Sequence, residues 1–310
     1  MWGNSIRLVA FFLILLIGQR EIMRLTYWLF LFFIYTFSFT PFWLLYPFSD
    51  FLYYFFFYVY RYRKKVVFAN LRRAFPDKKP DEIDRIARAF YRHFCDIVVE
   101  SVKAFSMTRQ DVLKRYRVAN AEILDPLYEN GQSIIAVLGH YNNWEWGSMA
   151  AGMQIKHKPV AFYKPLSNKL IDDYIEKTRA KNGTELISIS HTTRTFDTFK
   201  DTPSLFLMLA DQSPSNLSRS IWVQFLNQET ATLHGPEKHA TRTGMPVYFV
   251  DVRKIRRGYY EAVLSPLVLD PSSARPGEIT EKYMKALEEQ IVRKPEYWLW
   301  SHRRWKHTRK

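Results

Sequence analysis

Cysteine, glycine and metal-binding motifs are scarce in this sequence of 310 residues. The single cysteine, Cys95, excludes an internal disulfide and is typical of a protein in a reducing compartment. There are only 11 glycines and no glycine-rich phosphate loop, which argues against a nucleotide cradle. Paired-cysteine spacings and the His-Glu-x-x-His pattern are also missing. We therefore predict neither a metal site nor a cofactor.

Basic residues exceed acidic ones, with a formal net charge of +15 and an isoelectric point of about 9.7. Such a surface could meet nucleic acid, anionic lipid headgroups or an acidic carrier protein. The basic residues are scattered or lie beside an apolar segment, and no nucleic-acid-binding motif occurs. We do not expect a nucleic-acid partner.

The first sixty residues contain far more than their share of the aromatic side chains. An apolar run at residues 8–17 is too short to span a bilayer. Residues 25–49 carry no formal charge and are long enough to span one, although Pro41 and Pro47 could divide them into a helix and a bent continuation. They show almost no polar face, so we predict a membrane-anchor helix.

A basic cluster follows the apolar segment. The nearly all-aromatic residues 51–60 suit a membrane interface, and Arg61, Arg63, Lys64 and Lys65 come next. The positive-inside rule then places the rest of the chain on the cytoplasmic side. We predict a membrane-anchoring and interfacial segment at residues 1–60 and a cytoplasmic domain at residues 61–310.

From residue 133 onward, short apolar runs alternate with helical patterns. Strands are predicted at 134–138, 160–163, 186–189, 205–209, 247–252 and 259–264. Helices are predicted at 143–153, 168–181, 193–200, 236–243 and 278–292. This order predicts an α/β fold with a mixed central sheet flanked by helices.

The stretch at residues 133–147 combines a buried-strand pattern with candidate catalytic side chains. The apolar run ends at Gly139, His140 follows, and Glu145 lies just beyond Asn142 and Asn143, two possible helix N-caps. On one regular helix, His140 and Glu145 would lie roughly 140° apart. They meet if His140 lies on the turn and Glu145 in the following helix, at the carboxyl end of a sheet where ligands bind.

Such a pair is suited to general base catalysis. A neutral imidazole takes a proton from a hydroxyl, while a carboxylate on its other nitrogen orients the ring and stabilises the imidazolium. By itself, the spacing also fits a histidine that only caps a turn.

Further motifs follow at the ends of later strands. They are Tyr163-Lys164-Pro165, Asp211-Gln212-Ser213, His234-Gly235-Pro236-Glu237 and a tryptophan-rich segment at 295–306. In this order, together with the apolar start and the segment at 61–76, they resemble the bacterial lipid A biosynthesis acyltransferases, the late lauroyl and myristoyl acyltransferase family. The resemblance covers residues 27–306.

This resemblance implies a membrane-bound O-acyltransferase of the bacterial inner membrane. It would move an acyl group from acyl carrier protein or coenzyme A to a hydroxyl of a lipid A precursor. It assigns His140 as the base and Glu145 as the residue that orients it, with Asp211 and Gln212 shaping the substrate site.

One position departs from the family pattern. Lys164 stands where the family usually has arginine, and a cation there could hold a phosphate or an oxyanion. Lysine keeps the charge but loses the bidentate geometry. The alternative acceptors are therefore another glycolipid, a lysolipid or an amino lipid.

Overall fold

The computed structural model describes residues 2–181 and 183–309, and it describes side chains from residue 20 onward. The short apolar run at residues 8–17 lies outside the described side chains.

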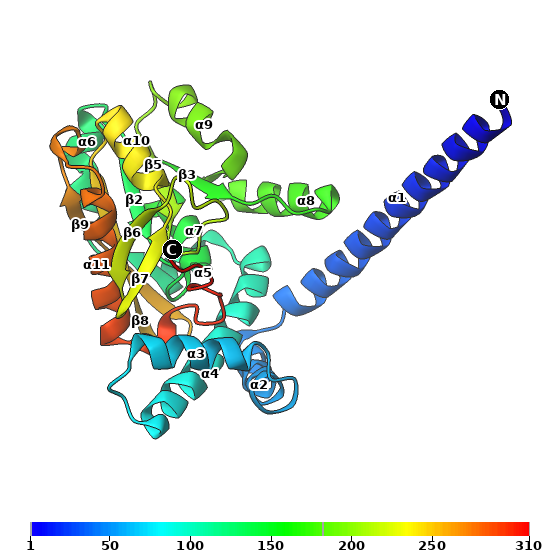
Figure 1. The fold of residues 1–310 in the computed structure, drawn as a ribbon, viewed down its shortest axis with the longest axis horizontal. Coiled ribbons are helices and arrows are strands. Elements are labelled where there is room, and N and C mark those ends of the chain that lie inside the picture. The colour runs from blue at the N-terminus through cyan, green and yellow to red at the C-terminus, as the bar shows by residue number, and fades with distance from the viewer. Residues whose placement is uncertain (1, 182, 310) are drawn as a thin grey trace.

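A seven-stranded mixed sheet forms the centre of the protein (Figure 1), in the order β1-β9-β8-β2-β5-β3-β4. Its strands are β1 (Tyr116–Val118), β2 (Ile134–Leu138), β3 (Lys158–Tyr163), β4 (Glu185–Ser188), β5 (Ser204–Leu209), β8 (Val247–Arg256) and β9 (Tyr259–Val268). Only the β8–β9 pair is antiparallel in this sheet. The predicted α/β class with a mixed sheet is confirmed, and all six predicted strands are present.

Helices cover both faces of the sheet. They are α3 (Lys64–Ala74), α4 (Pro80–Lys103), α5 (Arg109–Arg115), α6 (Asp125–Glu129), α7 (Trp144–Gln154), α8 (Lys169–Ala180), α9 (Thr192–Thr198), α10 (Gly235–Thr243) and α11 (Glu278–Arg293). A separate hairpin pairs β6 (Ile221–Phe225) with β7 (Gln228–Thr232).

The central strand β2 is buried on both faces. Ile135 and Val137 pack in one hydrophobic cluster with α4 and α11, while Ile134, Ala136 and Leu138 pack in another with α7. This alternation follows from the two-residue repeat of a strand. It explains why the sequence here is a continuous apolar run rather than an alternating one.

The N-terminal region consists of α1 (Trp2–Ser38) and α2 (Phe42–Tyr54), separated at Pro41. In Figure 1, α1 projects away from the sheet domain, whereas α2 lies beside α4. Large apolar side chains on both helices are exposed, among them Trp28, Phe32 and Trp43. Exposed apolar surface of this extent marks an interaction site for a protein or a membrane.

Within the part of the chain that the structure describes, no single helix is long and apolar enough to cross a bilayer. The segments Arg20–Ser38 and Phe42–Val59 have the required length and composition only together, and they bend by 118°. The predicted anchor helix is therefore not confirmed as one span. Of the two prolines, Pro41 marks the break, while Pro47 lies inside α2.

Candidate active site

His140 lies on the turn that follows β2. The preceding residue, Gly139, leaves the space that this turn needs: a Cβ there would lie 2.7 Å from Leu287 Cδ1 and 3.4 Å from Asp211 Oδ2. The glycine therefore lets the turn approach both side chains closely.

Asp211 holds the imidazole in place. Its Oδ1 lies 2.6 Å from His140 Nδ1, and its Oδ2 accepts a 2.9 Å hydrogen bond from the His140 backbone N–H. The two residues meet because β2 and β5 are parallel neighbours, so their carboxyl ends lie at the same edge of the sheet.

The charges of this pair favour its ionised form. Burial raises the pKa of Asp211, but the charge and hydrogen bonds of His140 outweigh burial and bring it to about 2. Burial lowers the pKa of His140, but the Asp211 carboxylate outweighs burial and leaves it above the ordinary value. Since an ionised carboxylate only accepts hydrogen bonds, the neutral imidazole carries its proton on Nδ1, and its Nε2 is the nitrogen that can accept one.

The tryptophan-rich C-terminal segment holds His140 and Asp211 in place through hydrogen bonds. Trp298 Nε1 donates a 2.8 Å hydrogen bond to Asp211 Oδ2, and the Leu299 N–H donates to the His140 carbonyl at 3.1 Å. A β-bridge joins Tyr141 to Trp298. The tryptophan-rich segment thus supports the orientation of Asp211 and of the histidine turn.

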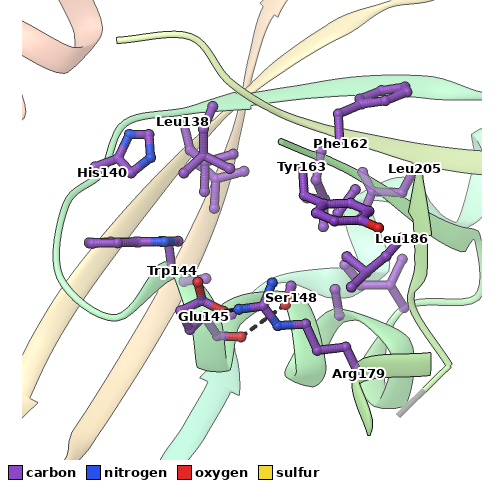
Figure 2. Close-up of a pocket in the computed structure, with 18 of the residues that line it drawn as sticks. Leu138, His140, Trp144, Glu145, Ser148, Phe162, Tyr163, Arg179, Leu186 and Leu205 are labelled. Carbon is purple, nitrogen blue, oxygen red and sulfur yellow. Dashed lines mark hydrogen bonds and ion pairs between the residues drawn. The ribbon is translucent and has the colours of Figure 1, made fainter. Parts of the chain in front are cut away.

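Glu145 is not hydrogen-bonded to His140, which corrects the arrangement expected from the sequence. Glu145 lies in the first turn of α7 and forms an ion pair with Arg179. In Figure 2, its carboxylate points toward Arg179, and Trp144 lies between it and His140. Asp211, which follows the neighbouring strand β5, contacts Nδ1 instead. The first turn of α7 orients Glu145 away from the imidazole and toward Arg179.

The start of α7 is held by a buried carboxyl group of α4. Asn143 Oδ1 caps the helix by accepting from the Trp146 N–H at 2.9 Å, as the sequence predicts. Glu100 Oε2 accepts hydrogen bonds of 2.8 Å from Asn143 Nδ2 and from the Tyr260 hydroxyl. Glu100 therefore links α4, α7 and β9 below the site.

The remaining predicted residues lie at different distances from the imidazole. Gln212 Nε2 lies 3.2 Å from His140 Nε2 and donates to it. Lys164 is exposed and follows β3 on the rim of the adjoining cavity.

That cavity, which we call the sheet cavity, has a volume of about 400 Å³. Its walls are apolar side chains of the strands and small residues of α7, including Leu138, Ala161, Leu205, Leu207 and Ala151. Figure 2 shows His140 and Trp144 on one side of it and Leu186 and Leu205 toward the other. A volume above 300 Å³ with an apolar lining and few polar groups is typical of a small-molecule or lipid-chain site.

Sequence reasoning gave no contact with the site to three contributors: Trp144, whose ring centroid lies 5.0 Å from that of His140, Arg179, and Trp298 of the tryptophan-rich segment noted above. Their contacts depend on helix and loop packing, so spacing along the chain could not reveal them. Among the described residues, no three His, Cys, Asp or Glu side chains are grouped to hold a metal ion.

Comparison with known proteins identifies the family of the chain. The chain is 22% identical over 245 residues to the lipid A biosynthesis palmitoleoyltransferase of Escherichia coli (strain K12), covering 79% of each chain. It has the same identity and coverage with the lipid A biosynthesis acyltransferase of Shigella flexneri. The sequence profile of the family described as bacterial lipid A biosynthesis acyltransferase matches residues 17–307, and the chain therefore belongs to that family.

Proposed function

We propose that this protein transfers a fatty acyl group from a thioester donor, acyl carrier protein or coenzyme A, to a hydroxyl of a lipid A precursor. The observation that carries the proposal is the His140–Asp211 pair at the border of an apolar cavity of about 400 Å³. The named activities of the two relatives support the acceptor class.

His140 is the general base of the proposed reaction. Its Nε2 accepts the proton of the acceptor hydroxyl, which takes the place of the Gln212 amide on that nitrogen. The hydroxyl oxygen attacks the thioester carbonyl, a new C–O bond forms and the C–S bond breaks. The proton then passes from the imidazolium to the departing thiolate, so the base is regenerated.

Asp211 and Glu145 have separate parts in this proposal. Asp211 orients the ring and stabilises the imidazolium through the 2.6 Å contact with Nδ1. Glu145 contributes more weakly to the charge around His140, and it holds the Arg179 guanidinium beside the sheet cavity. Lys164, on the cavity rim, provides a further cation for an anionic group of donor or acceptor.

Membrane attachment is part of the same proposal. Residues 1–60 would attach the protein to the inner membrane through exposed apolar side chains, with residues 61–310 as the catalytic domain on the cytoplasmic side. The exposed side chains of Arg61 and Lys65 are available to anionic headgroups.

A second acceptor class is favoured by Lys164. Because the family usually has arginine there, another glycolipid, a lysolipid or an amino lipid is the alternative acceptor.

Mass spectrometry of total lipids from cells with and without this gene tests the function. We expect one acyl chain to be missing from lipid A without it, and the parent gene, but not His140→Ala, to restore that chain. Purified protein assayed with each thioester donor identifies the donor. Unchanged lipid A, with a changed lysolipid or amino lipid, would contradict the first acceptor and support the second.

A further inference from the structure

A second cavity reaches His140 from the direction of α4. This α4 cavity has a volume of about 360 Å³ and lies between α4 and the segment at 297–299. Side chains of Phe90, Phe94, Ile97 and Val98 give it an almost wholly apolar lining.

The two cavities share part of their walls. His140 and Trp144 line both the sheet cavity and the α4 cavity. The two rings lie edge to face at a centroid distance of 5.0 Å. One imidazole therefore borders two apolar cavities, as transfer from a fatty acyl donor to a lipid acceptor requires.

The wall of the α4 cavity also contains a polar group that lacks a partner. His93 is 5% exposed, and its Nδ1 lies 3.2 Å from Lys254 Nζ. An ammonium group only donates hydrogen bonds, so Nδ1 accepts and the ring proton is on Nε2. Among the described residues, nothing accepts a hydrogen bond from this N–H. His93 lines the α4 cavity, and a buried donor without an acceptor is costly, so a ligand oxygen that reaches this N–H would relieve the cost.

Aromatic side chains connect this cavity with the exposed N-terminal segment. Phe94, in the cavity wall, stacks on Tyr62 at 5.7 Å, and Tyr62 stacks on Tyr60 at 6.4 Å. Tyr60 is 63% exposed and adjoins the aromatic residues that follow α2. The α4 cavity therefore lies next to the exposed aromatic surface at which a bilayer lipid would be held.

We propose that the α4 cavity binds a hydrocarbon chain of the acceptor lipid, and that His93 Nε2 donates a hydrogen bond to an oxygen of that lipid. The acyl chain of the donor then occupies the sheet cavity. This assignment rests on the proposed acyl transfer and adds which substrate each cavity takes.

Two filling substitutions test the assignment. Val98→Phe narrows the α4 cavity, and Ala151→Leu is the matched change in the sheet cavity. We expect Val98→Phe to raise the KM for the acceptor by about 10-fold or more, since a misfit of even one methylene has an effect of that size. The donor KM and chain-length preference should be unchanged. Ala151→Leu should change the donor parameters instead. The reverse pattern would overturn the assignment, and thermal unfolding serves as the check that both variants fold.

His93→Phe tests the hydrogen bond by removing the N–H and keeping an aromatic ring. As a positioning residue, His93 should affect acceptor binding, so the acceptor KM rises by about 10-fold. The kcat at saturating acceptor should stay near the parental value. A lower kcat with an unchanged KM would contradict this role.

Photolabelling separates this inference from the proposed function. The full-length protein is labelled with a long-chain hydroxyacyl amphiphile that carries a diazirine at its chain end. We expect labelled peptides from α4 in the parent and their loss in Val98→Phe. Labelling confined to sheet-cavity peptides would overturn the α4 assignment even if transfer is active. Labelling of α4 without transfer to any lipid would instead overturn the proposed function alone.

Discussion

At the scale of single residues, His140 has two carboxylates in its neighbourhood, and only Asp211 is bonded to the ring. Asp211 raises the pKa of His140 above its ordinary value of 6.5. A general base acts only when it is neutral, so activity should decrease as the pH drops below this raised pKa. Asp211→Asn removes the charge, which should move this acid limb to lower pH and reduce kcat about 10²–10⁴-fold. The pH dependence of kcat/KM measures both effects.

Glu145→Gln is the matched comparison. Its carboxylate pairs with Arg179, so its loss should move the acid limb less than Asp211→Asn does. A larger shift for Glu145→Gln would show that Glu145, rather than Asp211, governs the imidazole during turnover.

Lys164 provides another residue-scale prediction. If its ammonium holds an anionic substrate group, Lys164→Met should reduce turnover strongly without affecting the fold, since the side chain is exposed. Lys164→Arg should be tolerated if the site suits the arginine usual in the family, and damaging if it has contracted around a different acceptor. Assays on a lipid A precursor and on a lysolipid distinguish these cases. Parental rates for Lys164→Met on every acceptor would assign Lys164 to the surface only.

At the scale of elements, Glu100 connects the helix that forms the α4 cavity to the N-terminus of α7. Burial raises its pKa to about 7 from an ordinary value of 4.5. The folded protein thus binds a proton on the Glu100 carboxyl group more tightly than the unfolded chain does. The stabilisation of the fold by this bound proton is fully present below pH 4.5 and is lost as the pH rises through about 7.

Glu100→Gln should therefore flatten the dependence of the melting temperature on pH between 4.5 and 7. Glu100→Ala should cost about 3 kcal/mol or more, because Asn143 and Tyr260 both lose their acceptor. Thermal unfolding in detergent across this pH range measures both variants. An unchanged pH slope in Glu100→Gln would contradict the role of this proton.

At the scale of the whole molecule, the bend of 118° gives the N-terminal region two apolar helices instead of one straight span. Deleting residues 1–58 should release the domain from membranes only in part, because the basic cluster remains. The deletion removes Phe57, over which Lys64 lies, and Tyr58, whose carbonyl accepts from Arg61, whereas Arg63 still donates to the Ser301 carbonyl. Arg61, Lys64 and Lys65 are then the freer cations. Each contributes about 1 kcal/mol near an anionic surface.

Membrane fractionation of the truncated protein at low and high salt tests this attachment. Binding should weaken as salt screens the charges, and the further change of Arg61, Lys64 and Lys65 to glutamine should remove most of it. A truncated protein that is wholly soluble at low salt would show that the basic cluster does not attach it.

Most of the sheet could be predicted from the sequence, because its strands are buried apolar runs between turn residues. The short strand β1 escaped prediction since its three residues depend on pairing with β9, far along the chain. The β6–β7 hairpin also escaped it. Its turn places Leu226 and Asn227 at positive φ, which is not the Asn-Gly pattern typical of such turns.

The sequence by itself determined the fold class, the histidine turn after a buried strand, and the set of strand ends from which the site is built. Only the tertiary structure decided that Asp211 rather than Glu145 contacts His140 Nδ1. Spacing along the chain brings Glu145 near the turn. The strand order makes β5 the neighbour of β2, so Asp211 reaches the imidazole, and α8 brings Arg179 into an ion pair with Glu145 at the start of α7. Contacts across a sheet depend on which strands pair, and local sequence does not encode that choice.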